Sequence, residues 1–242
     1  PSDRVSVWGA VSHAVRTPSR SEDDIITPIP AINPFLLLPG NRAVESEEVI
    51  AYEFGARGQP AEEFYWDVAL FYNDYTSLVT SFPVFPPPIF QLVIGNQVTH
   101  EQTWGYELAA NYDVTEHWRT RLSYSFLRGV GALGRNIADS PRNQVYFQSS
   151  WDLNYGLSFD WIGRYVDHIG GIPGPLPAGP FAVPSYFEMD SRLAWQATDS
   201  IELFVVGRNL LDKHHLEFVS DQNGLIGTEV PREIYAGVAI RH

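Results

Sequence analysis

The chain has 242 residues, of which 44% are hydrophobic and 14% aromatic, and its mean hydropathy is −0.15. Its formal net charge of −13 excludes a general nucleic-acid-binding protein, which would need a basic face. A membrane helix needs about 20 apolar residues, and the best candidate, Pro34–Gly40, is far shorter and is bounded by proline and glycine.

Alternation of apolar and polar residues predicts ten β-strands along the chain. In one of them, Phe187 and Leu193 share one parity whereas Glu188, Asp190 and Arg192 share the other, so the strand has an apolar and a charged face. In chain order the strands are predicted at Arg4–Val15, Glu47–Arg57, Phe64–Tyr72, Trp104–Tyr112, Trp118–Phe126, Gln144–Asp152, Leu157–Tyr165, Phe187–Gln196, Ile201–Arg208 and Pro231–His242.

The connections between these strands alternate between short and long. Short turns are predicted near 58–62, 114–117, 152–155 and 197–200, and long loops at 17–46, 77–96, 129–141, 168–184 and 213–229. Pro83 and the run Pro86–Pro88 remove hydrogen-bond donors, which argues against a central strand there. Barrels of the outer membrane have this asymmetry, with short periplasmic turns and longer outer loops. The pattern therefore predicts an all-β, antiparallel, up-and-down transmembrane β-barrel.

Each predicted strand assigns one face to lipid and the other to the barrel lumen. Residues expected to meet lipid are Trp66, Val68, Leu70, Phe147, Phe159 and Leu193. Residues expected to face the lumen are Glu53, Asp67, Glu107, Arg121, Glu188 and Arg192. Aromatic residues expected to pack or to form girdles at the membrane interface are Trp8, Trp66, Tyr72, Trp104, Tyr112, Trp118, Trp151 and Tyr165.

Several motifs follow one another along most of the chain. They are AVRTPSR at Ala14–Arg20, GNRAVESEEVIAYEFGAR at Gly40–Arg57, hairpin segments at Ala69–Val79, Thr103–Phe126 and Ser140–Leu153, and GRNLLDK at Gly207–Lys213 after an alternating arm at Tyr186–Trp195. In this order they resemble the barrel of TonB-dependent outer-membrane receptors.

The resemblance implies that the chain corresponds to the second half of a barrel of about 22 strands. We expect residues 1–242 to be the C-terminal portion of the barrel domain, with the plug domain and the N-terminal barrel strands lying outside this chain. An open half barrel in lipid would leave unpaired edges at a cost of several kcal/mol per unsatisfied backbone group. The first and tenth strands are therefore expected to pair with chain that is not in this sequence.

The resemblance also implies energy-dependent uptake of a scarce small-molecule or metal-chelate ligand across the outer membrane of a Gram-negative bacterium. A ferric siderophore-type compound is the expected ligand, and haem is disfavoured because no histidine lies between Thr17 and Ser46. The expected partners are the lipid bilayer and a TonB-type energy-coupling protein that acts through the missing N-terminal part. No cofactor and no nucleic acid are expected.

Candidate ligand-binding residues lie in the predicted loops and the upper lumen. They are Arg20, Arg135, Arg164, His168, Arg208, His214 and His215, each with solvated surface as the alternative interpretation. His214 and His215 are adjacent and point to opposite sides of an extended chain, so no metal site is predicted from them. The inward charges near Asp160 and Glu188 are interpreted as lumen lining, and no catalytic residue or enzyme activity is predicted.

Two other classes of protein share the alternation. A passive porin-like channel or a barrel enzyme would have the same strands without the ordered motifs, and ion conductance would distinguish the channel. A soluble all-β binding domain would need a polar outward face, which the apolar parity of eight or more strands does not provide.

Overall fold

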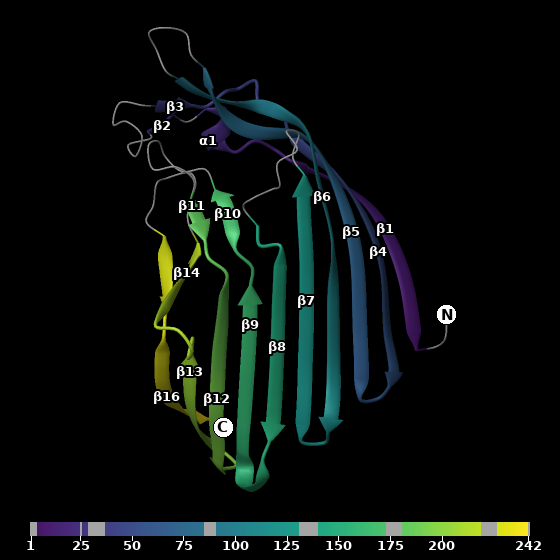
Figure 1. The fold of residues 1–242 in the computed structure, drawn as a ribbon, viewed down its shortest axis with the longest axis vertical. Coiled ribbons are helices and arrows are strands. Elements are labelled where there is room, and N and C mark those ends of the chain that lie inside the picture. Colours follow the sequence, from purple (N-terminus) through teal and green to yellow (C-terminus); the bar gives the residue numbers. More distant parts are fainter. Residues whose placement is uncertain are drawn as a thin grey trace.

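The computed structural model of the chain describes residues 4–24, 26–28, 37–84, 91–130, 140–172, 181–218 and 227–241. Ten long strands form one antiparallel sheet, and their bounds are β1 Val5–Arg16, β4 Glu47–Ala61, β5 Phe64–Val84, β6 Gln91–Thr115, β7 Trp118–Val130, β8 Asn143–Asp152, β9 Leu157–Val166, β12 Tyr186–Thr198, β13 Ile201–Arg208 and β16 Glu233–Ile240. Each strand pairs with the next in this order, from β1 at one lateral edge to β16 at the other (Figure 1). The predicted fold class and the ten strands are confirmed.

The two ends of the sheet differ in how the strands are connected. At one end, which we call the short-turn end, β4 and β5, β6 and β7, and β12 and β13 are joined by two residues each, and β8 and β9 by a stretch containing the 3₁₀ turn η1 Asn154–Gly156. All four predicted short turns are confirmed. The remaining connections lie at the opposite end, which we call the loop end (Figure 1).

Three of the predicted loops contain short paired strands. The small elements of the loop end are helix α1 Arg20–Asp23 and the strands β2 Ile26–Pro28, β3 Leu37–Pro39, β10 Ile169–Ile172, β11 Phe181–Val183, β14 His214–Phe218 and β15 Thr228–Pro231. They pair as β2 with β3, β10 with β11, and β14 with β15. These segments are too short to show a sustained period of two, which is why the sequence pattern predicted them only as loops.

The predicted loop at 77–96 is wrong for most of its length. Strands β5 and β6 continue as a two-stranded hairpin beyond the sheet, with Thr80 opposite Gly95 and Pro83 opposite Leu92. β4 stops pairing with β5 at Thr76, so the extension of β5 has β6 as its only paired neighbour among the described residues. Proline is tolerated where its missing N–H would face away from a partner strand. The proline rule therefore excluded a central strand but not this hairpin.

The strand register joins the apolar parities of neighbouring strands into one continuous face. Phe54 lies opposite Leu70, and Leu70 lies opposite Tyr106. The same face continues through further opposed pairs, which are Leu122–Phe147, Trp151–Phe159, Phe159–Leu193, Leu193–Val205 and Leu203–Val238. All six residues predicted to meet lipid lie on this face, which we call the outer face.

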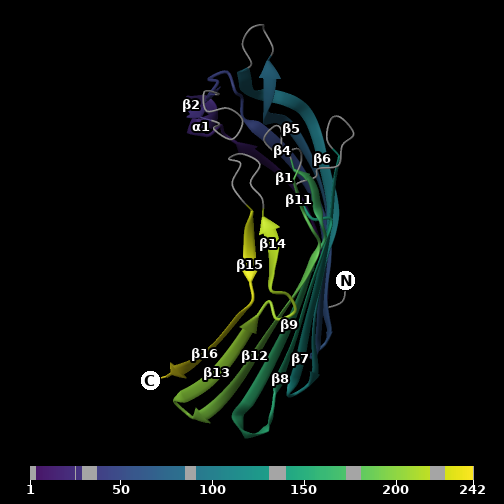
Figure 2. The same ribbon diagram turned by 60° about the vertical axis from the view of Figure 1, so that its left-hand side comes forward.

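The opposite parity forms the inner face, which lies on the concave side of the sheet with the β14–β15 hairpin (Figure 2). Asp67 lies opposite Arg57, Arg164 opposite Glu188, and Asp160 opposite Arg192. The six residues predicted to face the lumen share this parity. The predicted orientation of the strands is therefore confirmed.

The apolar outer face is exposed instead of being buried in a core. Leu193 is 47% exposed, and among the described residues only Ile94, Val166, Val183 and Ala194 are buried hydrophobic residues. A soluble all-β domain would bury its apolar face against a second layer. The single exposed sheet excludes that alternative and fits a surface whose solvent is lipid.

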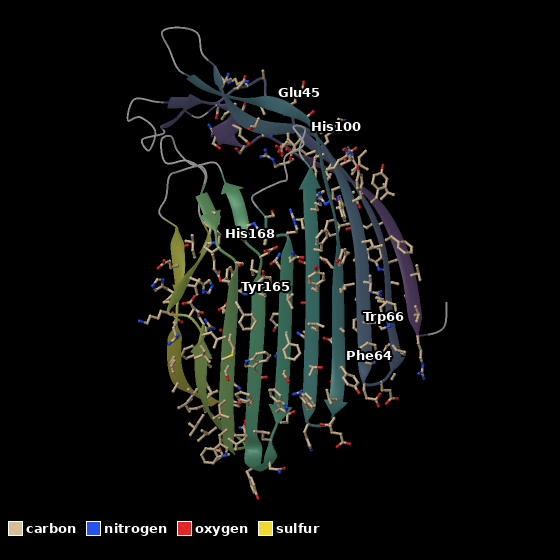
Figure 3. The ribbon with its side chains drawn as sticks, viewed as in Figure 1. Glu45, Phe64, Trp66, His100, Tyr165 and His168 are labelled. Atoms are coloured by element: carbon tan, nitrogen blue, oxygen red, sulfur yellow. The ribbon has the colours of Figure 1, made fainter. Side chains whose placement is uncertain are left out.

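The apolar band has a visible upper boundary. On the outer face, Tyr72 and Trp104 are opposed, and the next positions toward the loop end are polar, with His100 Nδ1 3.1 Å from Asp74 Oδ1. Figure 3 labels His100 near the loop end, whereas Trp66 lies toward the short-turn end. Tyr72 and Trp104 thus lie where an aromatic girdle is expected.

Trp8 does not belong to that girdle. It lies opposite Gly55 on the inner face, and its indole covers this glycine so closely that an added Cβ would overlap the ring. An aromatic ring laid across a glycine fills the space left by the missing side chain. The girdle interpretation of Trp8 is wrong, because its strand places it on the parity of Arg4 and Ser6.

Candidate functional site

Charged side chains from three strands meet on the inner face near the loop end. Arg164 in β9 lies opposite Glu188 in β12, because the two strands pair in that register. The β14–β15 hairpin brings His215 and Glu217 to the same place. We call Arg164, Glu188, His215 and Glu217 the Arg164 cluster.

One guanidinium connects the two carboxylates of this cluster. Arg164 Nη2 donates to Glu217 Oε1 at 2.8 Å and also to Glu188 Oε2. His215 Nε2 lies 3.0 Å from Glu217 Oε1. The ring of Tyr186 stacks on the imidazole, with centroids 4.3 Å apart and planes inclined by 25°. The contacts link the barrel wall to the hairpin.

The cluster combines buried and accessible groups. His215 is 8% exposed, and its Nδ1 has no hydrogen-bond partner among the described residues. Glu188 is almost as deeply buried, whereas the side chain of Arg164 remains 43% exposed. One ligand atom each from Glu188, His215 and Glu217 lies within 4.8 Å of the others, so these three side chains could hold a metal ion.

Two further arginines line the inner face below the cluster. Arg208 lies with its Cζ 5.7 Å from the ring centroid of Tyr235, and Arg192 donates to Glu202 Oε1 at 2.7 Å. A cleft of about 410 Å³ is lined by Arg164 and Arg208 together. The surface can therefore present guanidinium groups to an anionic molecule in the lumen.

The motif at Ala14–Arg20 forms an ion-pair cluster at the loop end. Arg16 donates to both carboxylate oxygens of Glu22 at 3.1 and 2.9 Å, and its Nε donates to Glu47 Oε2 at 2.5 Å. Glu22 also accepts from the backbone N–H and hydroxyl of Ser19. The Arg16 guanidinium, together with the Ser19 donors, lowers the pKa of Glu22 to about 2. The motif holds the start of the loop against β4.

The motif at Gly207–Lys213 connects β13 to β14, which continues toward the loop end in the same direction (Figure 2). Asn209 is fully buried and adopts a left-handed backbone conformation with φ of 47°. Its N–H donates to Asp190 Oδ1 at 2.9 Å, and its Nδ2 donates to the Val230 carbonyl at 3.0 Å. Asparagine tolerates this conformation better than most residues. The motif is therefore an architectural element that positions the β14–β15 hairpin.

Two of the predicted ligand-binding residues meet in the structure. Arg164 and His215 both contact Glu217. Arg208 lines the same cleft as Arg164. His214 points to the other side of β14 and pairs with Glu229 at 2.9 Å, which confirms that the adjacent histidines diverge.

The other predicted residues lie apart. Arg20 is largely exposed on α1 and pairs with Asp24 at 3.2 Å, and Arg135 lies outside the described residues. His168 follows β9 at the loop end (Figure 3), where its Nδ1 lies 3.2 Å from Asp167 Oδ1. The amide of Asn143 donates to Asp167 and, with the backbone N–H of His168, lowers the pKa of that carboxyl. His168 thus has an acidic neighbour, which disfavours it as an anion contact.

Sequence reasoning missed Glu217 and Tyr186 as site residues and interpreted Glu188 only as wall lining. Their signal was present as two spaced pairs, Tyr186 with Glu188 and His215 with Glu217. Residues two apart on a strand share a face. The sequence gives no indication that the two strands face each other, because β14 lies in a segment without sustained alternation.

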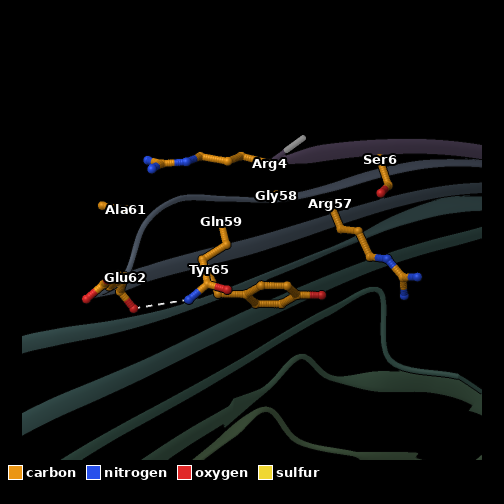
Figure 4. A pocket seen from close by; sticks show the side chains of 8 residues that line it. All are labelled: Arg4, Ser6, Arg57, Gly58, Gln59, Ala61, Glu62 and Tyr65. Carbon is orange, nitrogen blue, oxygen red and sulfur yellow. Dashed lines mark hydrogen bonds between the residues drawn. The ribbon is translucent and has the colours of Figure 1, made fainter. Parts of the chain in front are cut away.

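A separate pocket lies on the inner face at the short-turn end. It has a volume of about 530 Å³ and is lined by Arg4, Ser6, Arg57, Gly58, Gln59, Ala61, Glu62 and Tyr65 (Figure 4). Arg4 Nη1 donates to the Pro60 carbonyl at 2.5 Å, which holds this guanidinium against the β4–β5 turn. The pocket lies next to the lateral edge of the sheet, so its surroundings depend on what pairs with β1.

No helix within the described ranges has the length and apolar character needed to cross a membrane. The family model described as TonB-dependent receptor-like, beta-barrel, matches residues 1–210. No curated protein matches the sequence.

Solved structures share the fold at low sequence identity. The pyoverdine outer-membrane receptor FpvA from Pseudomonas aeruginosa is 16% identical with a TM-score of 0.77, and the match covers 100% of this chain and 34% of that one. A mutant of the ferric enterobactin receptor PfeA from Pseudomonas aeruginosa is 14% identical with a TM-score of 0.75, covering 99% and 38%. The siderophore receptor PirA from Acinetobacter baumannii is 16% identical with a TM-score of 0.71, covering 98% and 39%. The chain thus spans between about a third and two fifths of their length.

Proposed function

The chain belongs to the TonB-dependent receptor-like β-barrel family, whose model matches residues 1–210, and we propose that it is the C-terminal part of the barrel of an outer-membrane receptor for energy-dependent ligand uptake. The observation that carries the proposal is the ten-stranded sheet with an apolar outer face and a charged inner face. Such a sheet needs lipid on one side and an aqueous lumen on the other.

The lateral edges of the sheet support the proposal that more barrel strands lie outside this chain. Within the described residues, β1 pairs only with β4, and β16 only with β13. In lipid, each unpaired backbone group costs several kcal/mol, so a membrane barrel must close. The N-terminal strands of the receptor would pair with both edges, and a plug domain would fill the lumen.

In this proposal the loop end faces the outside of a Gram-negative cell and the short-turn end faces the periplasm, as in other outer-membrane barrels. The matching family model is described as TonB-dependent receptor-like. A ligand captured at the loop end would pass along the inner face when a TonB-type partner in the inner membrane moves the plug. The lipid bilayer is the partner of the outer face.

The most specific part of the proposal is the class of ligand. Ferric siderophore-type compounds are chelates that often carry negative charge, and the inner face offers Arg164 and Arg208 on one cleft. The similar structures named above include a pyoverdine receptor and a ferric enterobactin receptor. At 14% and 16% identity these structures share only the fold with this chain, so the proposed ligand class rests on the charges of the inner face.

Uptake by the intact receptor tests the proposal. Iron-starved cells that carry the receptor should accumulate radioactive iron from a siderophore only while the energy-coupling protein is present. Deleting most of the 17–46 or the 168–184 segment should abolish this uptake and leave a folded barrel, because long loops carry binding on a scaffold that tolerates their change. A matched control replaces the two-residue turn of β12 and β13, at the short-turn end, with another two-residue turn.

Two results would contradict the proposal. Uptake that continues without the energy-coupling protein, together with steady ion conductance in planar bilayers, would identify a passive channel. Unchanged ligand affinity after both loop deletions would place recognition outside this chain.

A further inference from the structure

The Arg164 cluster and the neighbouring Tyr186 include two pairs of side chains that face each other from different strands. Tyr186 and Glu188 are two residues apart on β12, and His215 and Glu217 are two residues apart on β14. Because side chains two apart point to the same face of a strand, each strand presents both members of its pair to the other. The His215 and Glu217 pair lies outside the motifs of the family resemblance.

Three of these side chains have the chemistry and spacing of a transition-metal site. One ligand atom each from Glu188, His215 and Glu217 lies within 4.8 Å of the others. Zn²⁺ binds imidazole nitrogen and carboxylate oxygen at about 2.0–2.2 Å, so the ligand atoms around it lie about 3–4 Å apart. Small side-chain rotations would bring the three groups to that spacing.

His215, one of the three candidate ligands, is buried and held in a fixed position. Its side chain is 6% exposed and is held by the stacked ring of Tyr186. One of its two ring nitrogens has no partner among the described residues, although a buried polar atom without a partner is unfavourable. The other nitrogen, Nε2, contacts Glu217 Oε1, and no other contact of this atom is seen among the described residues. Nε2 is therefore the nitrogen that faces the carboxylates and would be the ligand atom, on a ring that burial and stacking already hold in place.

Arg164 provides the positive charge in the metal-free cluster. It donates to Glu217 and to Glu188, so two carboxylates share one guanidinium. A divalent ion would compensate both carboxylates more fully, and Arg164 is 43% exposed and has room to turn toward the lumen. Its Cζ already lies 5.9 Å from the ring centroid of Tyr186.

We propose that Glu188, His215 and Glu217 form a binding site for a divalent transition metal of the Zn²⁺ type, with Arg164 as the cation that the metal displaces. The bound metal would fasten the β14–β15 hairpin to the barrel wall, because Glu188 comes from the wall and the other two ligands come from the hairpin. The inference is independent of the imported ligand.

Co²⁺ titration of the intact receptor in detergent, after removal of metal with EDTA, tests the site. Co²⁺ replaces Zn²⁺ in such sites and gives visible absorption bands when its coordination is tetrahedral. We expect saturable bands that added Zn²⁺ abolishes. His215→Ala should weaken binding by at least about tenfold, since even changes to residues that only orient metal ligands cost about 10–100-fold. His214→Ala is the matched control, because His214 lies on the other side of β14 and pairs with Glu229.

Two further variants separate a metal site from an ion-pair network. Glu217→Gln keeps the size of the side chain and should weaken Co²⁺ binding, even if His215→Ala does not fold. Arg164→Met removes the competing cation and should tighten binding. The proposal is overturned if wild type and Arg164→Met both show no saturable Co²⁺ bands. It is also overturned if His214→Ala reduces affinity as much as the folded variant at His215 or Glu217 does. Heat-dependent gel mobility identifies the folded fraction of each variant.

Discussion

Arginine substitutions at two adjacent positions of β7 measure the difference between the two faces of the sheet. Leu122 lies on the outer face opposite Phe147 and is 47% exposed, whereas Ser123 lies on the inner face. Leu122 is four residues beyond Trp118, which begins the strand at the short-turn end. At about 3.3 Å per residue and a tilt of about 40°, it lies about 10 Å above that end, near the middle of an apolar band about 25 Å tall.

The magnitude follows from this depth. Arginine at the midplane of the lipid face costs about 2–4 kcal/mol, which lowers the folding equilibrium constant by about 30- to 700-fold at 1.4 kcal/mol per factor of ten. Ser123→Arg should cost less than about 1 kcal/mol, because its cleft also contains Asp67 and Glu107. Urea-dependent folding of the intact receptor into lipid vesicles measures both changes.

Each variant is the control for the other, because both introduce arginine into the same strand and differ only in the face that receives it. Equal penalties at Leu122 and Ser123 would refute the assignment of lipid and lumen to the two faces. A larger penalty at Ser123 would reverse it.

Three other predictions follow from single residues. The pKa of Glu22 is about 2 against its ordinary 4.5, so its pair with Arg16 should contribute its full stability above about pH 4.5 and lose it as the pH falls toward 2. Hydrogen exchange of the α1 amides, corrected for intrinsic rates, should show this pH dependence, and Glu22→Gln should remove it. Asn209→Ala should destabilise the intact receptor by about 2–4 kcal/mol in urea titrations, through the lost hydrogen bond and the left-handed backbone, and Asn209→Gly, which tolerates that backbone, should cost less. Asp at both Val238 and Ile240 should prevent membrane insertion in a heat-modifiability assay, because both residues are on the outer face and more than half exposed; normal insertion would show that β16 does not lie in lipid.

Much of the fold was predictable because the two faces of each strand meet different solvents. Lipid and an aqueous lumen impose a period of two on every long strand, and this period is visible in the sequence from Phe54 to Val238. Short turns were equally visible, because only a few residues separate the alternating stretches. The parity, and with it the orientation of Leu193 and Arg192, needed no knowledge of which strands are neighbours.

The prediction was wrong at two positions where a rule about one residue type was applied without knowledge of the residue's surroundings. Pro83 argued against a strand, yet it lies in a hairpin that has left the sheet. Trp8 is an aromatic residue of the kind found in girdles, but its parity places it on the inner face, over Gly55. For Pro83 the deciding fact is which strands lie beside it, and spacing along the chain does not specify this. For Trp8 the inner-face parity was visible in the sequence, and only the glycine beneath its ring was not.

The Arg164 cluster could not be predicted for the same reason. Glu188 lies 24 positions after Arg164, and Glu217 lies 53 positions after it, so no short motif contains all three. The sequence did identify Arg164 and His215 as candidates, because a charged or imidazole side chain near a strand end at the loop end can reach the lumen. It could not show that Glu217 joins them.

The recognisable motifs and the candidate site therefore have different roles in the molecule. The Arg16–Glu22 pair and Asn209 fix the path of the chain just beyond strand ends. The pair joins residues close in sequence, and Asn209 supplies one required backbone conformation. Such requirements restrict residue identity and therefore produce a motif. The inner face requires only polarity at every second position, and any combination of charges satisfies it. Inner-face residues such as Arg164 and Arg208 can therefore vary more freely than the motif residues without changing the fold.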